Sequence, residues 1–185
     1  NTFKQIFNSS DENTRHCRSV IEDEDVIYLG TRRGLFYKPV ESSQWVLLAN
    51  IFKDESIEAL IADRRNLYIA TASDLYIMEK DTLRTRKVLS LKASDGIADE
   101  HLAGEEGEVN ETSSTIKDVQ IVEVGQRNDL IVGSTRGFYY SHNFGDDWER
   151  IQGSEIDISE LTSFVATPII SHDTCEEGSN PCFSL

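Results

Sequence analysis

No part of the 185-residue sequence contains the run of about 18 uncharged apolar residues that a membrane-spanning helix needs, so direct membrane insertion is not expected. Positive charge is scarce as well, since 18 lysines and arginines stand against 33 aspartates and glutamates and the formal net charge is −15. Nucleic-acid backbones and anionic membrane surfaces repel so acidic a domain on average, which excludes them as expected partners. The composition, with 38% apolar residues, instead favours one globular unit whose surface charge serves solubility.

The signatures of common catalytic sites are missing too. No Gly-rich phosphate loop, His-Glu-x-x-His helix or nucleophile elbow is present, and the early Phe/Tyr-Arg-x-Pro motif of sialidases is absent. The four histidines, at positions 16, 101, 142 and 172, have no metal-ligand spacing, so neither a metal nor a cofactor is expected. With 33 acidic residues a carboxylate pair can always be drawn, and abundance is no argument for a glycosidase. The segment is therefore predicted not to be an enzyme.

Cysteine occurs only three times. Cys175 and Cys182 bracket a loop short enough to close by a disulfide, and such a bond predicts an extracytoplasmic protein, whether secreted, periplasmic or luminal. Two incidental thiols are the alternative, and a zinc site that adds His172 would need a fourth ligand of unusual geometry. Cys17 is left over and is expected to be a thiol without catalytic role.

What the sequence does contain is a tight hairpin tip at 141–148. Ser141 and Asn143 suit side-chain to backbone hydrogen bonds, Gly145 supplies positive φ, and Trp148 opens the returning strand as an apolar anchor. The spacing Ser-x-Asn-x-Gly-x-x-Trp resembles the Asp-box of sialidase-type (BNR-repeat) β-propellers, with asparagine in the Asp place and Asp147 where threonine is usual. In that family the box is a structural turn and not a catalytic one.

The surroundings of this tip recur along the chain. Residues 133–140 match 30–37, and each run reaches a tryptophan fifteen residues after its first glycine. A third copy, 70–77, begins forty residues after the first, and the next step of sixty-three residues is forty plus an acidic insertion at 92–115. Such a period predicts an all-β fold, a β-propeller of four-stranded antiparallel blades.

On this repeat the chain divides into six parts: the last strand of a preceding blade (1–7), blade one (15–50), blade two (57–91), the acidic insertion (92–115), blade three (116–153) and the start of blade four (161–185). Three to four blades do not close a ring, so we expect an incomplete fragment whose remaining blades come from a longer chain or, less favoured, from a second chain. Asn8 and Asn110 fit the N-glycosylation pattern, which matters only in a secreted eukaryotic protein.

The pattern Gly-Thr-x-Arg-Gly-Leu-Phe/Tyr followed by the hairpin resembles exported propellers of the photosystem II assembly factor (Ycf48-like) kind. That resemblance implies a non-catalytic scaffold that holds partner proteins. Two alternatives stay open. One is a sialidase- or xyloglucanase-like glycoside hydrolase whose catalytic residues lie outside this segment, and the other is a sortilin-like extracellular receptor.

Two arginines are the candidate partner-binding residues. Arg33 and Arg136 take the same place in the turn between the second and third strands of their blades, and the insertion 92–115 connects blades on the same side. Aligned arginines in a chain this acidic could bind a carboxylate-bearing partner by bidentate pairing. The alternative is that each arginine simply precedes a turn glycine and is solvated.

Overall fold

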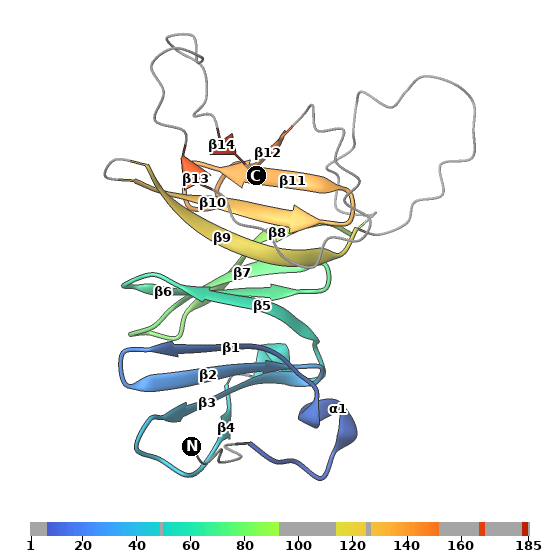
Figure 1. Ribbon diagram of the computed structural model, residues 1–185, viewed down its shortest axis with the longest axis vertical. Helices are drawn as coiled ribbons and strands as arrows, with labels where there is room; N and C mark the ends of the chain where they lie inside the picture. Colours follow the sequence, from blue (N-terminus) through green and yellow to red (C-terminus); the bar gives the residue numbers. More distant parts are fainter. Residues whose placement is uncertain are drawn as a thin grey trace, which may run out of the picture.

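A computed structural model of the protein describes residues 7–48, 50–92, 114–124 and 127–151, together with two short strands at 167–168 and 183–184. It contains three four-stranded antiparallel sheets, each with its strands in chain order. The sheets are stacked face to face along the long axis of the molecule (Figure 1).

The strands of blade one are β1 (Cys17–Asp23), β2 (Val26–Thr31), β3 (Gly34–Pro39) and β4 (Val46–Leu47). Those of blade two are β5 (Ile57–Ala62), β6 (Asn66–Thr71), β7 (Asp74–Glu79) and β8 (Thr85–Ser90). Those of blade three are β9 (Ile116–Val124), β10 (Arg127–Ser134), β11 (Gly137–Ser141) and β12 (Glu149–Ile151).

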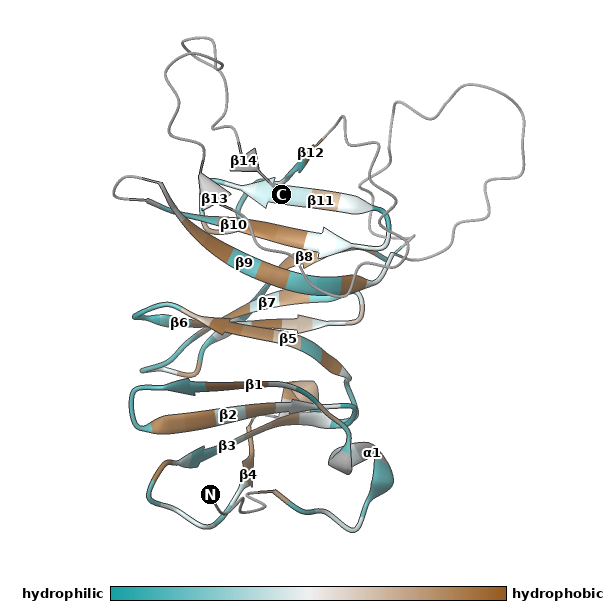
Figure 2. Ribbon diagram, viewed as in Figure 1, coloured by the Kyte–Doolittle hydropathy of each residue, from teal (hydrophilic) through white to brown (hydrophobic). Residues whose placement is uncertain are grey.

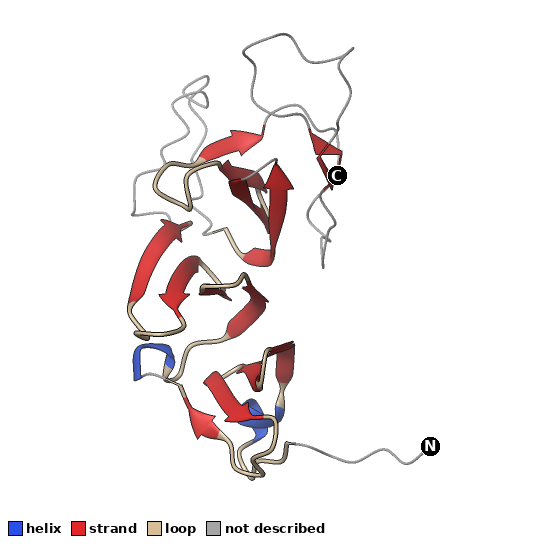
Figure 3. Cartoon of the chain, turned by 90° about the vertical axis from the view of Figure 1, so that its left-hand side faces the viewer, coloured by secondary structure: helices blue, strands red, loops and turns tan. Residues whose placement is uncertain are grey.

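The remaining elements are short. Helix α1 (Glu12–Arg15) precedes blade one, and a 3-10 helix (Asn50–Phe52) joins blade one to blade two. Strand β13 (Thr167–Pro168) pairs with β14 (Phe183–Ser184). The expected all-β propeller of four-stranded antiparallel blades is confirmed, and the described blades form an open arc (Figure 3).

A hydroxyl at the end of the second strand closes the next turn in every blade. Thr31 Oγ1 donates to the carbonyl of Gly34 (2.9 Å) and accepts from the N–H of Arg33 (3.1 Å). Ser134 in blade three makes the equivalent pair of bonds, and Thr71 in blade two bonds the backbone of the residue three positions on. Gly34 has φ 125°, a value that side chains rarely allow, which is why glycine follows the turn. These short-range bonds explain the recurring Gly-Thr/Ser-x-Arg-Gly pattern.

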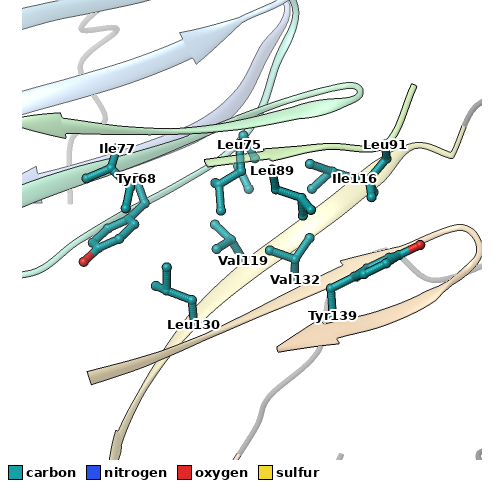
Figure 4. Packing of buried hydrophobic residues seen from close by; sticks show 12 residues of the cluster. Tyr68, Leu75, Ile77, Leu89, Leu91, Ile116, Val119, Leu130, Val132 and Tyr139 are labelled. Atoms are coloured by element: carbon teal, nitrogen blue, oxygen red, sulfur yellow. The ribbon is translucent and has the colours of Figure 1, made fainter. Parts of the chain in front are cut away.

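The apolar core lies between the blades rather than within one of them. One cluster joins blades one and two, and the other joins blades two and three (Figure 4). Strand β6 serves both: Leu67 and Ile69 belong to the first cluster, while Tyr68 and Ala70 belong to the second. Because successive side chains of a strand point to opposite faces, a middle blade must be apolar on both. The middles of the strands are accordingly hydrophobic, and the turns between the strands are hydrophilic (Figure 2).

Close approach of blades one and two requires glycine at one position. A Cβ on Gly30 would lie 2.7 Å from Cγ2 of Ile57 on the facing blade. No real Cβ contact is that short, so any side chain there would push the two blades apart. Gly30 is therefore part of the packing between blades.

Several expectations fall on residues whose structure is not described. They are the last strand of a preceding blade (1–7) apart from its final residue, most of the start of blade four (161–185), the Cys175–Cys182 disulfide, most of the acidic insertion and the glycosylation pattern at Asn110. Cys17 lies at the start of β1 with an exposed side chain. Over the described ranges, no helix has the length and hydrophobicity to cross a bilayer, and no group of three or more His, Cys, Asp or Glu side chains is arranged to hold a metal ion.

Candidate functional site

The turns of the blades lie on two rims. The first rim carries the turns between first and second strands and between third and fourth strands; it is on the left in Figure 1 and faces the viewer in Figure 3. The second rim carries the turns between second and third strands, on the right in Figure 1. The 141–148 turn lies on the first rim, and both Arg33 and Arg136 lie on the second.

The four residues singled out in the 141–148 turn share one hydrogen-bond network. Ser141 Oγ accepts from the N–H of Gly145 (2.8 Å) and donates to Asn143 Oδ1 (3.0 Å). The same Asn143 oxygen accepts from the N–H of Asp147 (2.9 Å), and Gly145 has φ 83°. The returning residue, Trp148, donates its indole N–H to the carbonyl of Gly145 at 3.2 Å.

This turn also joins blade three to blade two. The Trp148 indole N–H donates to the carbonyl of Val88 in β8 (2.7 Å), and a Cβ on Gly145 would lie 2.8 Å from Val88 Cβ. Arg86, also in β8, donates to the carbonyl of Phe144 (2.7 Å) and to Asp146 (3.0 Å). Trp148, the apolar anchor of the turn, is half-buried, because its indole N–H reaches a carbonyl at the rim. The turn is thus a joint between blades.

The structure does not bring Arg33 and Arg136 together. They lie on blades one and three, and blade two stands between them (Figure 1). Arg33 is already engaged by acids of the segments before and after its blade, at 3.1 Å from Asp11 and 2.7 Å from Asp54. Asp54, followed by Asp11, raises the pKa of the Arg33 guanidinium above its ordinary value. Partner binding by these two arginines stays a prediction.

A hollow that the sequence reasoning did not anticipate lies on the first rim at the junction of blades two and three. Its volume is about 1050 Å³. Its lining comes from the β5–β6 turn, β7, the β7–β8 turn and the start of β8 in blade two, and from Asn128 and Phe144 of blade three. Phe144 is 44% exposed although it is large and apolar. The volume of the hollow is slightly larger than the roughly 300–1,000 Å³ of small-ligand sites, so the hollow has room for a ligand with more than one functional group.

Arginine dominates the cations of this hollow, with four of them: Arg64, Arg65, Arg84 and Arg86. Arg86 holds the joint described above. The guanidinium groups of the other three make no hydrogen bond or ion pair with any other described residue, and all three side chains are exposed. Guanidinium groups match carboxylate, sulfate and phosphate groups by bidentate hydrogen bonding.

Two of the three acids that line the hollow are engaged in its walls, and the third, Asp81, is exposed. Asp63 accepts hydrogen bonds from the Tyr68 hydroxyl (2.7 Å) and from the N–H groups of Arg65 and Asn66 (2.7 Å each). Burial alone would raise the pKa of the Asp63 carboxyl, but these donors hold it below its ordinary value. Burial and the facing carboxylate in turn raise the pKa of Tyr68. Glu79 accepts from the hydroxyl of Thr82 at 2.7 Å. Asp63 and Glu79 are therefore satisfied internally, whereas Asp81 and three of the four arginines have no side-chain partner among the described residues.

The forty-residue repeat contains the signal that would have found this hollow. Asp63-Arg64-Arg65-Asn66 of blade two aligns with Asp23-Glu24-Asp25-Val26 of blade one, so two acids are replaced by two arginines. Beside each turn, an equivalent backbone hydrogen bond joins the start of the second strand to the end of the third, from the N–H of Lys80 to the Arg65 carbonyl (2.9 Å) and from that of Val40 to the Asp25 carbonyl (2.8 Å). Positive charge at 64 and 65 is thus not required by the turn.

Comparison with protein-family models gives no match, and comparison with curated protein sequences gives none either. Solved structures do resemble the chain. The extracellular domain of a putative hybrid two-component system from B. thetaiotaomicron matches with a TM-score of 0.55 at 18% identity, over 84% of this chain and 19% of that one. That of a putative one-component system from the same organism matches with a TM-score of 0.54 at 17% identity, over 88% and 21%. The chain spans about a fifth of these structures. The computationally designed Ika4 protein matches with a TM-score of 0.51 at 10% identity, over 92% and 88%. These likenesses support the fold.

Proposed function

We propose that the chain is part of an extracellular, non-catalytic propeller that holds a partner protein. The observation that carries the proposal is the hollow on the first rim, which is lined by three arginine side chains that make no hydrogen bond or ion pair with another described residue. Concave surfaces with a few convergent polar groups are the usual places where proteins bind ligands and partners. Arginine is enriched at protein interfaces, where its planar group pairs with acids.

The acids of the hollow support binding rather than hydrolysis. A glycosidase needs one carboxylic acid whose pKa is raised so that it can protonate the leaving oxygen, opposite a second carboxylate. Asp63 has its pKa lowered, and its oxygens are occupied by donors of its own turn. Glu79 is bonded to Thr82 within the β7–β8 turn. These carboxylates serve to shape the walls.

The extracellular location is proposed on two grounds. Two of the structures that resemble the chain are extracellular domains, and they cover most of its length. The expected disulfide between Cys175 and Cys182 would persist only in an oxidising compartment. Peptide mapping without reductant tests the second ground, because a single linked peptide containing both cysteines is expected.

Site-specific photo-crosslinking in the source cells tests the proposal. A photoreactive phenylalanine analogue at exposed Thr82, inside the hollow, is compared with the same analogue at exposed Arg32 on the second rim. A protein adduct formed from position 82 and absent from position 32 is expected, in the extracytoplasmic fraction. An adduct from position 32 alone would place the binding face on the second rim, beside Arg33. Release of reducing sugar from polysaccharides, lost on neutralising acids of the hollow, would contradict the non-catalytic role.

A further inference from the structure

We propose that the hollow between blades two and three recognises an acidic peptide segment, whose carboxylates pair with Arg64, Arg65 and Arg84. This rests on the proposed function and specifies the chemistry of the partner. In a chain of net charge −15, three uncommitted guanidinium groups on two neighbouring turns form a local positive site. This local positive charge, in an otherwise acidic chain, is complementary to an acidic peptide segment.

The arginines are not needed to build this kind of blade. Blade one carries Glu24 and Asp25 at the aligned positions, between β1 and β2, and its second strand pairs with the end of its third strand by the same backbone hydrogen bond as in blade two. In the β7–β8 turn, Arg84 aligns with Gln44 of blade one by the same step of forty residues. Each blade-one counterpart is neutral or acidic, so cations in this region distinguish blade two.

An exposed apolar side chain beside the arginines favours a peptide over other anions. Phe144 lines the hollow and is 44% exposed. An acidic peptide offers carboxylates to the arginines and an apolar side chain to Phe144. Inorganic phosphate and sulfated sugars supply the anionic groups but not the aliphatic side chain. A volume of about 1050 Å³ leaves room for several residues of such a segment.

Fluorescence anisotropy of labelled peptides on the purified chain tests the inference. The probe is fluorescein-labelled Glu-Glu-Glu-Leu-Glu-Glu, and the same peptide with glutamine in place of glutamate is its neutral reference. We expect saturable binding of the acidic peptide, weakened at high salt, and at least tenfold weaker binding of the neutral peptide. Equal binding of the two peptides, or no binding of the acidic one, overturns the inference.

Two variants of equal charge locate the site. Arg64→Glu with Arg65→Asp installs the acids that blade one carries, and Arg32→Glu with Lys53→Glu changes the charge by the same amount at exposed positions outside the hollow. We expect the first to weaken peptide binding at least tenfold and the second to change it less than twofold, with thermal unfolding of both close to that of the parent chain. Equal weakening by both would mean that only the overall field acts, and the proposed site would be wrong.

Two further arms separate the sources of negative charge and the two proposals. A sulfated oligosaccharide that binds more tightly than the acidic peptide, and loses affinity in the Arg64→Glu, Arg65→Asp variant, would overturn the peptide assignment in favour of a glycan. Competition by inorganic phosphate at equal concentration would overturn it in favour of a small anion. If the cross-linked adduct at Thr82 forms but the acidic peptide does not bind, the scaffold proposal stands and this inference falls.

Discussion

Trp148 is one of two side chains that hold the joint between blades two and three, and the effect of removing it can be calculated. The Trp148 indole N–H donates a hydrogen bond to the carbonyl of Val88. Val88 is not paired with any residue of β7 in the β7–β8 ladder. The register runs from Leu75↔Leu89 to Tyr76↔Lys87, so Val88 is the extra residue of a bulge. Bulges leave the groups of the extra residue outside the ladder, and the indole N–H satisfies this carbonyl at 2.7 Å. Replacing Trp148 by phenylalanine keeps an aromatic ring there and removes the donor.

The expected loss is about 1–2 kcal/mol, because a net hydrogen bond contributes about 1 kcal/mol and the carbonyl at the rim regains only part of its bonding from water. For a chain of this size, that lowers the melting temperature by roughly 2–8 °C. Trp148→Ala removes the ring as well, and about 3 kcal/mol is expected, at the low end for aromatic truncation because the side chain is only half-buried.

Far-UV circular dichroism gives the melting temperatures, and hydrogen exchange shows where the structure opens. Exchange should rise in β8 and β12 of the Trp148→Phe variant and stay unchanged in β1 and β2. Val46→Ala, at a side chain in blade one that is 47% exposed, is the matched control and should stay within about 0.5 kcal/mol of the parent. An unchanged melting temperature for Trp148→Phe, or equal loosening of all blades, would refute the joint.

Three other expectations follow from the described contacts. Gly30→Ala should destabilise the chain by about 1–3 kcal/mol, seen as a lower melting temperature, because a Cβ cannot fit against Ile57; an unchanged value would contradict this packing. Burial opposes ionisation of Asp74, but Lys92, Ser90 and Lys87 hold the pKa of its carboxyl below the ordinary value. The contribution of the Asp74 carboxylate to stability is therefore full above about pH 4 and is lost as pH falls through the folded-state pKa. Melting scans of the parent chain should therefore fall more steeply on acidification than those of Asp74→Asn, and parallel curves would speak against it. Arg33→Ala with Arg136→Ala should leave the melting temperature nearly unchanged, as expected for exposed arginines; if partner binding in a pull-down is also unchanged, the second rim is not the binding face.

The architecture was predictable because its causes are local and repeat along the chain. A hydroxyl and a glycine close each turn between second and third strands, as Thr31 and Gly34 do in blade one, and the strands between turns are apolar on both faces. The repeat step of forty residues therefore carries the fold. The confirmed prediction of four-stranded antiparallel blades rests on these signals.

The contacts between blades were not predictable in the same way. The bulge at Val88 has no sequence signature, so the place of the Trp148 indole at the rim was missed. Arg33 meets Asp11 and Asp54, which lie outside the aligned repeats and could not be matched to it by spacing. The hollow joins turns of blade two to Phe144 of blade three, and only the stacking of the blades shows which turns meet.

A charge transplant separates the hollow from the net charge of the chain. Glu24→Arg with Asp25→Arg, added to Arg64→Glu with Arg65→Asp, exchanges the residues of two equivalent turns and restores the formal net charge to −15. The long-range attraction or repulsion of an acidic peptide is then nearly that of the parent chain. Binding should nevertheless remain at least tenfold weaker in the anisotropy assay, because the moved arginines lie in blade one, away from Arg84 and Phe144, which line the hollow at the junction with blade three. If the exchange restores parental affinity, a pair of arginines in any blade suffices, and the stacking of blades two and three has no part in recognition.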